Sequence, residues 1–174
     1  MKPTTRLMAA AIAGAAAVFV AGTASAQALK PLTVRLDWVT HGMHAAFHLA
    51  TEKDAFRKAG LDVKMEDGNG SVVTVQLVGS GNFDVGHANL ASMAMGRDKG
   101  LPVTSIAGYV RRSDMGVLTP VELNIKTVKD LEGKRLIYTT GSLEAPFLDA
   151  FFKAGGTSRD KINLVSVAAA AKIN

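Results

Sequence analysis

The 174-residue chain has 20 Lys and Arg residues, 15 Asp and Glu residues, and no cysteine. Without cysteine, disulfides cannot stabilise the fold, so it must rely on a hydrophobic core. The formal charge of +5 does not indicate nucleic-acid binding, because the basic residues are interspersed with acids and form no stripe with interleaved aromatic residues.

The first 26 residues are typical of a secretory signal peptide. Lys2 and Arg6 precede an apolar run at residues 7–22, and Ala24-Ser25-Ala26 is a small-x-small cleavage site. The run is short for a transmembrane span of roughly 20 residues. We therefore expect cleavage after Ala26 and export to a bacterial periplasm. Removal of the leader leaves about 148 residues, enough for one ordinary domain and too few for two well-developed ones.

Hydrophobic spacing predicts alternating strands and helices in the first part of the mature chain. The predicted elements are strand 32–36, helix 45–59, strand 61–66, helix 72–78, strand 83–87, helix 90–97 and strand 103–110. Residues 72–78 are ambiguous, because their β-branched side chains favour a strand while the strand-helix rhythm favours a helix. We predict a helix there.

After Pro120 the pattern starts afresh. A helical turn at 128–132, a strand at 134–138, a helix at 142–154 and a strand at 162–167 are predicted. The whole indicates an α/β fold with parallel sheets and flanking helices, and a change of domain near residues 111–120.

Three candidate ligand-binding residues surround the first strand-to-helix turn. In open α/β sheets, ligands bind outside the carboxyl ends of the strands, near helix N-termini. Trp38 could stack on a flat ligand or fill the core, and Asp37 could accept ligand hydrogen bonds or cap the following turn. His44 could hydrogen-bond a ring nitrogen or carbonyl, or be a partly exposed histidine without a role.

The next two strand-to-helix loops should face the same cleft. They contribute Asn69 and Ser71, where Ser71 is also a possible helix N-cap, and then Asn89, which could bind a ligand or act only as an N-cap. Tyr109 ends the strand that leads to the second part of the chain. It could line the cleft or pack beneath the first part.

The second part of the chain offers Gly141 and Ser142 before a predicted helix. Backbone N–H groups there could hold an anionic or carbonyl group, although Ser142 could also serve only as a cap. His41, His44 and His48 share a helix face, but no Cys or Asp/Glu cluster from a second segment joins them. We therefore expect no metal and no cofactor.

The order of several segments resembles one family of proteins. These segments are Asp37-Trp38 with His44, Gly-Leu-Asp-Val at 60–63, Gln-Leu-Val-Gly-Ser-Gly at 76–81, Phe-Asp-Val-Gly at 83–86, and Val-Lys-Asp-Leu-Glu-Gly-Lys at 128–134. With the leader, they resemble substrate-binding proteins of ABC importers in the thiamine-pyrimidine and nitrate/sulfonate/taurine superfamily. The resemblance covers roughly residues 32–167.

The resemblance implies a periplasmic binding protein of type II, in which two α/β lobes close on a ligand. It divides the chain into a signal peptide at 1–26, lobe I at 27–112, and a hinge with a partial lobe II at 113–174. Family members run to about twice this mature length, consistent with ordinary domain sizes. We therefore expect the sequence to be a fragment or a truncated product.

The resemblance also implies a function without catalytic residues. The protein would be a monomer that captures a small, flat, nitrogen-containing solute of the thiamine-pyrimidine kind. It would deliver this solute to an ABC permease with its ATPase, contacting the membrane only through the permease. An alternative ligand is an oxyanion such as an alkanesulfonate, taurine or nitrate, held mainly at Gly141 and Ser142.

Two alternatives come from other classes. One branch of the superfamily makes the thiamine pyrimidine with its own lysine and histidine, but an ungapped reading from residues 84–86 puts Ala88 and Ser92 at those positions. This disfavours an enzyme. The other alternative is an inactive fragment, with strand edges left unpaired and apolar faces uncovered.

Overall fold

The computed structural model describes residues 28–112 and 115–172, so the signal peptide expected at 1–26 lies outside the described residues. Its first sheet contains three parallel strands in the order β2-β1-β3. They are β1 (Lys30–Arg35), β2 (Leu61–Glu66) and β3 (Val85–Gly86). Parallel neighbours need crossover connections, and here each crossover is helical. The expected parallel α/β fold is confirmed for this part of the chain.

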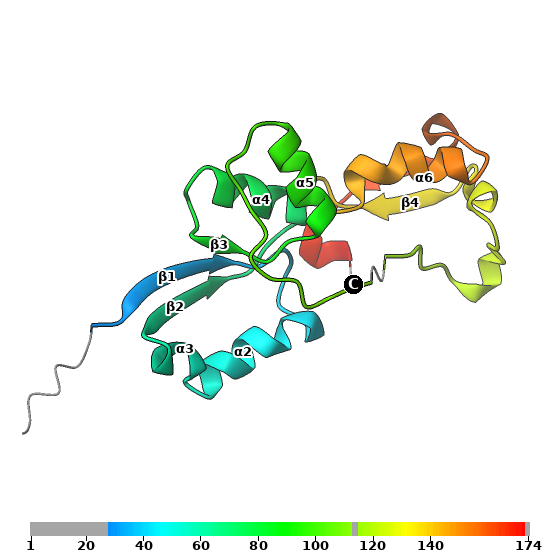
Figure 1. Ribbon diagram of the computed structural model, residues 1–174. Coiled ribbons are helices and arrows are strands. Elements are labelled where there is room, and N and C mark those ends of the chain that lie inside the picture. The colour runs from blue at the N-terminus through cyan, green and yellow to red at the C-terminus, as the bar shows by residue number, and fades with distance from the viewer. Residues whose placement is uncertain (1–27, 113–114, 173–174) are drawn as a thin grey trace, which may run out of the picture.

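Helices cover both faces of this sheet. Figure 1 shows α2 (Ala45–Glu52) and α3 (Ala55–Lys58) on one face, with α4 (Ser71–Gly79) and α5 (Leu90–Asp98) on the other. A 3-10 turn, η1 (Gly42–His44), precedes α2. The helix predicted at residues 72–78 is therefore confirmed. Within the described ranges, no helix has the length and apolar character needed to cross a membrane.

Two details of these helices differ from the sequence predictions. The helix expected over 45–59 is broken, because Asp54 adopts a left-handed conformation with φ of 55° that no α-helix accommodates. Ser71 is not the N-cap of α4. Gly70 holds that position, and the Ser71 hydroxyl donates to Asp37 instead.

The strand predicted at 103–110 is absent from the structure. Residues 101–112 form an irregular crossover segment, in which Val103 is buried but Ile106 is 79% exposed. Strand propensity mainly measures how well side chains fit a half-buried pleated surface. None of the described strands pairs with this segment, so its β-branched residues remain in an irregular conformation.

A second parallel sheet follows, formed by β4 (Arg135–Tyr138) and β5 (Asn163–Ser166). The main helix beside it is α6 (Leu148–Ala154), and Leu131, Leu148, Phe152 and Ile162 form the core. The remaining elements are the 3-10 turns η2 (Val121–Leu123), η3 (Val128–Leu131), η4 (Ala145–Phe147), η5 (Arg159–Lys161) and η6 (Ala169–Lys172).

The helix predicted at 142–154 begins later than expected. Pro146 lies in η4, and the regular α-helix starts only at Leu148. A helix starting at Ser142 would place Pro146 in its interior, where the proline ring clashes with the preceding turn and one hydrogen bond is lost. Ser142 therefore lies in a bend and does not open a helix.

Candidate ligand-binding site

The candidate site lies at the carboxyl ends of β1, β2 and β3. The loops after β1 and β2 are joined by backbone hydrogen bonds, from the Gly68 N–H to the Trp38 carbonyl at 3.0 Å and from the Gly70 N–H to the Asp37 carbonyl at 2.7 Å. A Cβ atom at Gly68 would lie 2.0 Å from the Leu36 carbonyl oxygen. Only glycine permits this approach, which fixes the position of Asp37 and Trp38.

Three side chains donate hydrogen bonds to the Asp37 carboxylate. His44 Nε2 and His87 Nδ1 both lie 2.9 Å from Oδ1, and the Ser71 hydroxyl lies 3.2 Å from Oδ2. Burial raises the pKa of Asp37, but the hydrogen bonds from His87 and His44 outweigh it and lower the pKa to about 2. Asp37 is therefore a charged acceptor at neutral pH, and its side chain remains 20% exposed.

His44 supports Asp37 from beneath and is completely buried. Its Nδ1 accepts the backbone N–H of His41 at 3.3 Å, so the proton of the neutral ring is on Nε2, facing the carboxylate. Burial lowers the pKa of His44, and the opposing effect of Asp37 does not compensate. Direct ligand contact by His44 stays a prediction, and it would require the ring to lose one of these two partners.

His87 is a further residue of the site, beside the candidates predicted from the sequence. It follows β3, and its ring lies between Asp37 and the hydroxyl of Tyr109, which is 2.9 Å from His87 Nε2. The Tyr109 hydroxyl also donates to the Met43 carbonyl at 3.0 Å. Tyr109 thus joins the cluster from the crossover segment. Position alone could have indicated His87, because it follows the carboxyl end of β3 and Asp37 follows the carboxyl end of the neighbouring strand β1.

The polar loop residues predicted from the sequence make different contacts in the site; they are Asn69, Ser71 and Asn89. The Ser71 hydroxyl donates to Asp37 and accepts the backbone N–H of Asn89 at 3.1 Å, so it links two loops. The Asn89 side chain accepts the Ala91 N–H at 2.9 Å and caps α5, which is the alternative role considered for it. Asn69 is exposed and does not join the Asp37 cluster.

Trp38 is half-buried and does not fill the core. The Lys172 ammonium, from η6 in the second part of the chain, lies 5.6 Å from the centroid of the indole ring. Lys172 also forms an ion pair with Glu144. The indole face therefore borders the second part of the chain, and a cation already occupies it.

Gly141 faces the N-terminus of α4 through its carbonyl oxygen, and both donors of Ser142 are already used. The Gly141 carbonyl accepts the Val72 N–H at the N-terminus of α4, at 3.1 Å. Ser142 donates both its N–H and its hydroxyl to the Thr139 carbonyl, at 3.1 and 2.6 Å, and is only 2% exposed. The wall formed here thus presents the Gly141 carbonyl oxygen in place of the N–H groups that the sequence predicts.

Residues 41–173 match the NMT1/THI5-like family. The chain belongs to this family. It is 28% identical over 141 residues to the formylaminopyrimidine-binding protein of Halalkalibacterium halodurans, a match that covers 81% of this chain and 43% of the relative. It is 33% identical over 109 residues to a 4-amino-5-hydroxymethyl-2-methylpyrimidine phosphate synthase of Saccharomyces cerevisiae, covering 62% of this chain and 32% of the enzyme.

The fold of the chain resembles that of a solved structure. The alkanesulfonate-binding protein SsuA of Xanthomonas axonopodis pv. citri superimposes with a TM-score of 0.63 at 18% identity, covering 82% of this chain and 49% of that one. This confirms the expected type II periplasmic binding protein fold. The chain spans less than half the length of these three proteins.

In this NMT1/THI5-like chain, Asp37, His44 and His87 bring their ligand atoms within 4.8 Å of one another, as a metal site would. The hydrogen-bond pattern does not fit such a site. A histidine that binds metal through Nε2 carries its proton on Nδ1, usually donated to an acceptor. In His44 the Nδ1 atom faces an N–H donor, so Nε2 must retain the proton. The cluster is therefore a hydrogen-bonded support for Asp37.

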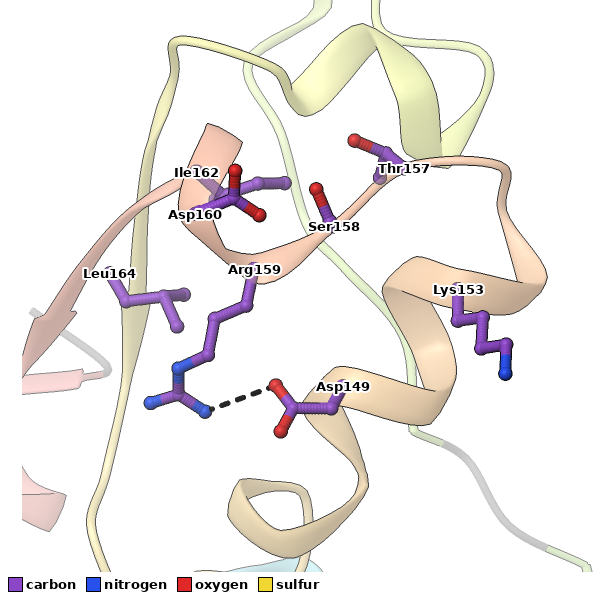
Figure 2. A pocket seen from close by; sticks show the side chains of 8 residues that line it. All are labelled: Asp149, Lys153, Thr157, Ser158, Arg159, Asp160, Ile162 and Leu164. Atoms are coloured by element: carbon purple, nitrogen blue, oxygen red, sulfur yellow. Dashed lines mark hydrogen bonds and ion pairs between the residues drawn. The ribbon is translucent and has the colours of Figure 1, made fainter.

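A separate surface depression in the second part of the chain does not resemble a ligand site. Figure 2 shows it between α6 and η5, with an ion pair from Arg159 to Asp149 at 3.5 Å and Lys153 pointing away from its centre. Two acidic and two basic side chains line it, with Asp160 as the second acid. Their formal charges cancel, so the depression has no clear preference for a charged solute.

Proposed function

We propose that the protein is the substrate-binding component of an ABC importer and that it captures a small, flat, nitrogen-containing solute of the thiamine-pyrimidine kind. The proposal places it in the periplasm after cleavage of the signal peptide behind Ala26. The named ligand of the formylaminopyrimidine-binding relative supports this choice. Delivery to a permease follows from the same assignment.

The observation that carries the proposal is an ionised carboxylate beside a half-buried indole. Among the described residues, Asp37 Oδ2 has one hydrogen-bond partner, the Ser71 hydroxyl, and a carboxylate oxygen can accept a further hydrogen bond. Trp38 follows Asp37 directly and is half-buried. An aminopyrimidine offers N–H donors in the plane of its ring and a flat face for stacking, so one molecule can use both residues.

An oxyanion fits this site less well. Asp37 stays ionised because its pKa is about 2, and its charge repels an anion. At the opposite wall, Gly141 presents its carbonyl oxygen, and both donors of Ser142 are used by Thr139. A sulfonate or nitrate would therefore meet acceptors at both positions. The likeness to SsuA concerns the fold.

The residues present also favour binding over synthesis of a pyrimidine. Ala88 and Ser92 stand where the ungapped comparison places the lysine and histidine of the enzyme branch. Alanine has no reactive group, and Ser92 is only 3% exposed. This chain thus belongs to the same family as the synthases among its relatives, but it has neither the lysine nor the histidine at these two positions.

Titration of the 174-residue chain tests the proposal, with Trp38 fluorescence as the signal. We expect saturation by formylaminopyrimidine or hydroxymethylpyrimidine, and no saturation by taurine or nitrate. Asp37→Asn should weaken pyrimidine binding about 10- to 100-fold, because a hydrogen bond to a charged group is lost. The matched control, Asp149→Asn in the remote depression, should leave affinity unchanged. Saturation by taurine alone would overturn the proposal.

Export requires a separate measurement. Mass spectrometry of the protein from a periplasmic extract should give a chain that begins at Gln27. A chain that retains Met1 and remains in the cytoplasmic fraction would contradict the proposed location.

A further inference from the structure

The crossover segment is connected to the Asp37 cluster through Tyr109 and His87. Over residues 104–112, the hydrogen bonds that the structure describes between this segment and the rest of the chain are those of the Tyr109 hydroxyl. The Tyr109 ring also contacts the His87 ring, with centroids 5.3 Å apart, and the Phe47 ring at 5.9 Å. The other residues of the segment are exposed.

The hydrogen bonds of Tyr109 and His87 determine which of their atoms carry protons. The Met43 carbonyl has no hydrogen to give, so the Tyr109 hydroxyl must donate its single proton there. The contact between Tyr109 and His87 Nε2 is then a hydrogen bond only if Nε2 is the donor. His87 Nδ1 must also donate, because it faces the ionised carboxylate of Asp37. Both ring nitrogens therefore carry protons when every contact is made.

A neutral His87 cannot keep all of these contacts. Asp37 retains the proton on Nδ1, which leaves Nε2 as an acceptor. The Tyr109 hydroxyl then donates either to His87 or to the Met43 carbonyl, and the other contact is lost. The segment therefore has one hydrogen bond fewer to the rest of the chain when His87 is neutral. The Asp37 carboxylate then faces a neutral donor in place of a cation.

We propose that His87 is a proton-controlled positioning residue, whose imidazolium form holds Asp37 and the crossover segment together and whose neutral form loosens the segment at Tyr109. This inference goes beyond the proposed function, because it requires no particular solute. Histidine is the side chain that ordinarily changes charge between about pH 5 and 8.

The groups around the His87 ring are compatible with this role. Among the described residues they come from four elements: Asp37 after β1, His44 in η1, Phe47 in α2 and Tyr109 in the crossover segment. Burial, and then the charge of Asp37, raise the pKa of Tyr109 above its usual 10, so its hydroxyl stays protonated between pH 5 and 8. Phe47 contributes no charge. His44 is neutral, as described above.

Nuclear magnetic resonance of the 174-residue chain tests the proposal. Imidazole nitrogen shifts report the charge and tautomer of His87, and backbone nitrogen relaxation reports the order of residues 106–112. We expect order parameters of roughly 0.85 at low pH and below roughly 0.6 once His87 is neutral. The two changes should have the same midpoint, and the neutral form should carry its proton on Nδ1.

Two variants separate this mechanism from a general effect of pH. Tyr109→Phe removes the hydroxyl, so the segment should be mobile at every pH while His87 still titrates. His48→Gln, at an exposed histidine on α2, should leave the transition unchanged. A segment whose order is independent of pH in the native sequence, a neutral tautomer protonated on Nε2, or an unchanged transition in Tyr109→Phe would each overturn the proposal.

Discussion

Substitution of Gly70, which contacts Gly141, tests how the two parts of the chain pack against each other. Gly70 has φ of 143°, and a Cβ atom there would lie 2.1 Å from the Gly141 carbonyl oxygen. That same oxygen accepts the Val72 N–H. Gly70→Ala would therefore strain the backbone, force the Gly141 segment away by about 1 Å, and break this hydrogen bond.

The expected loss in the free energy of unfolding is about 3–5 kcal/mol, from backbone strain, overpacking and one lost hydrogen bond. Gly60→Ala is the matched control. Gly60 also has a positive φ, 78°, but nothing lies within 4 Å of its added Cβ, so we expect a loss of about 1–2 kcal/mol. Urea unfolding followed by Trp38 fluorescence measures both variants.

The comparison between the two glycines decides the outcome. If both variants lose the same free energy of unfolding, the Gly141 segment does not pack on the N-terminus of α4 and does not form the opposite wall of the site. If Gly70→Ala loses more, its native-state tryptophan emission should change as well. Displacement of the Gly141 segment would move Lys172, which belongs to the same part of the chain, relative to Trp38.

Two further predictions use the same unfolding assay. The pKa of Asp37 is lowered from 3.8 to about 2, so its contribution is complete above about pH 4 and is lost as pH falls through 2. We expect the native chain to lose about 1–2 kcal/mol more than Asp37→Asn between pH 4 and pH 2, allowing for solvent screening of a partly exposed group; equal losses would contradict the assignment. Phe152→Ala, at a fully buried side chain, should cost about 3–5 kcal/mol. Phe151→Ala, at a neighbour that is 38% exposed, should cost clearly less, and similar losses would argue against the described core.

Local patterns in the sequence predicted the secondary structure correctly where neighbouring elements restrict it. Residues 72–78 have strand-forming side chains, yet the alternation of elements correctly indicated a helix, because a parallel sheet needs a crossover between β2 and β3. The same propensities failed at residues 103–110. That segment has no strand partner in the described part of the chain, and propensity alone cannot supply one.

The candidate site was only partly predictable for a related reason. Strand ends identify which loops converge, and this brought Asp37 and Ser71 into the correct neighbourhood. Tyr109 also joins the cluster, although the strand predicted to end there is absent. Which atom meets which depends on tertiary packing. His44 was considered a ligand contact because of its place near a helix start, whereas burial makes it a support for Asp37. His87 follows a strand of only two residues, a weak signal in the sequence.

Two charged side chains near Trp38, those of Lys172 and Asp37, limit which solutes can bind beside it. The indole face of Trp38 is occupied by the Lys172 ammonium, which pairs with Glu144, and Asp37 is the residue before Trp38 in the chain. A flat ring that stacks on Trp38 must displace this cation, and it can recover the lost attraction only if the ring is itself electron-poor or cationic. The same ring must offer an N–H group to Asp37. Under the proposed function, both requirements favour a flat ring with N–H groups over a simple anion.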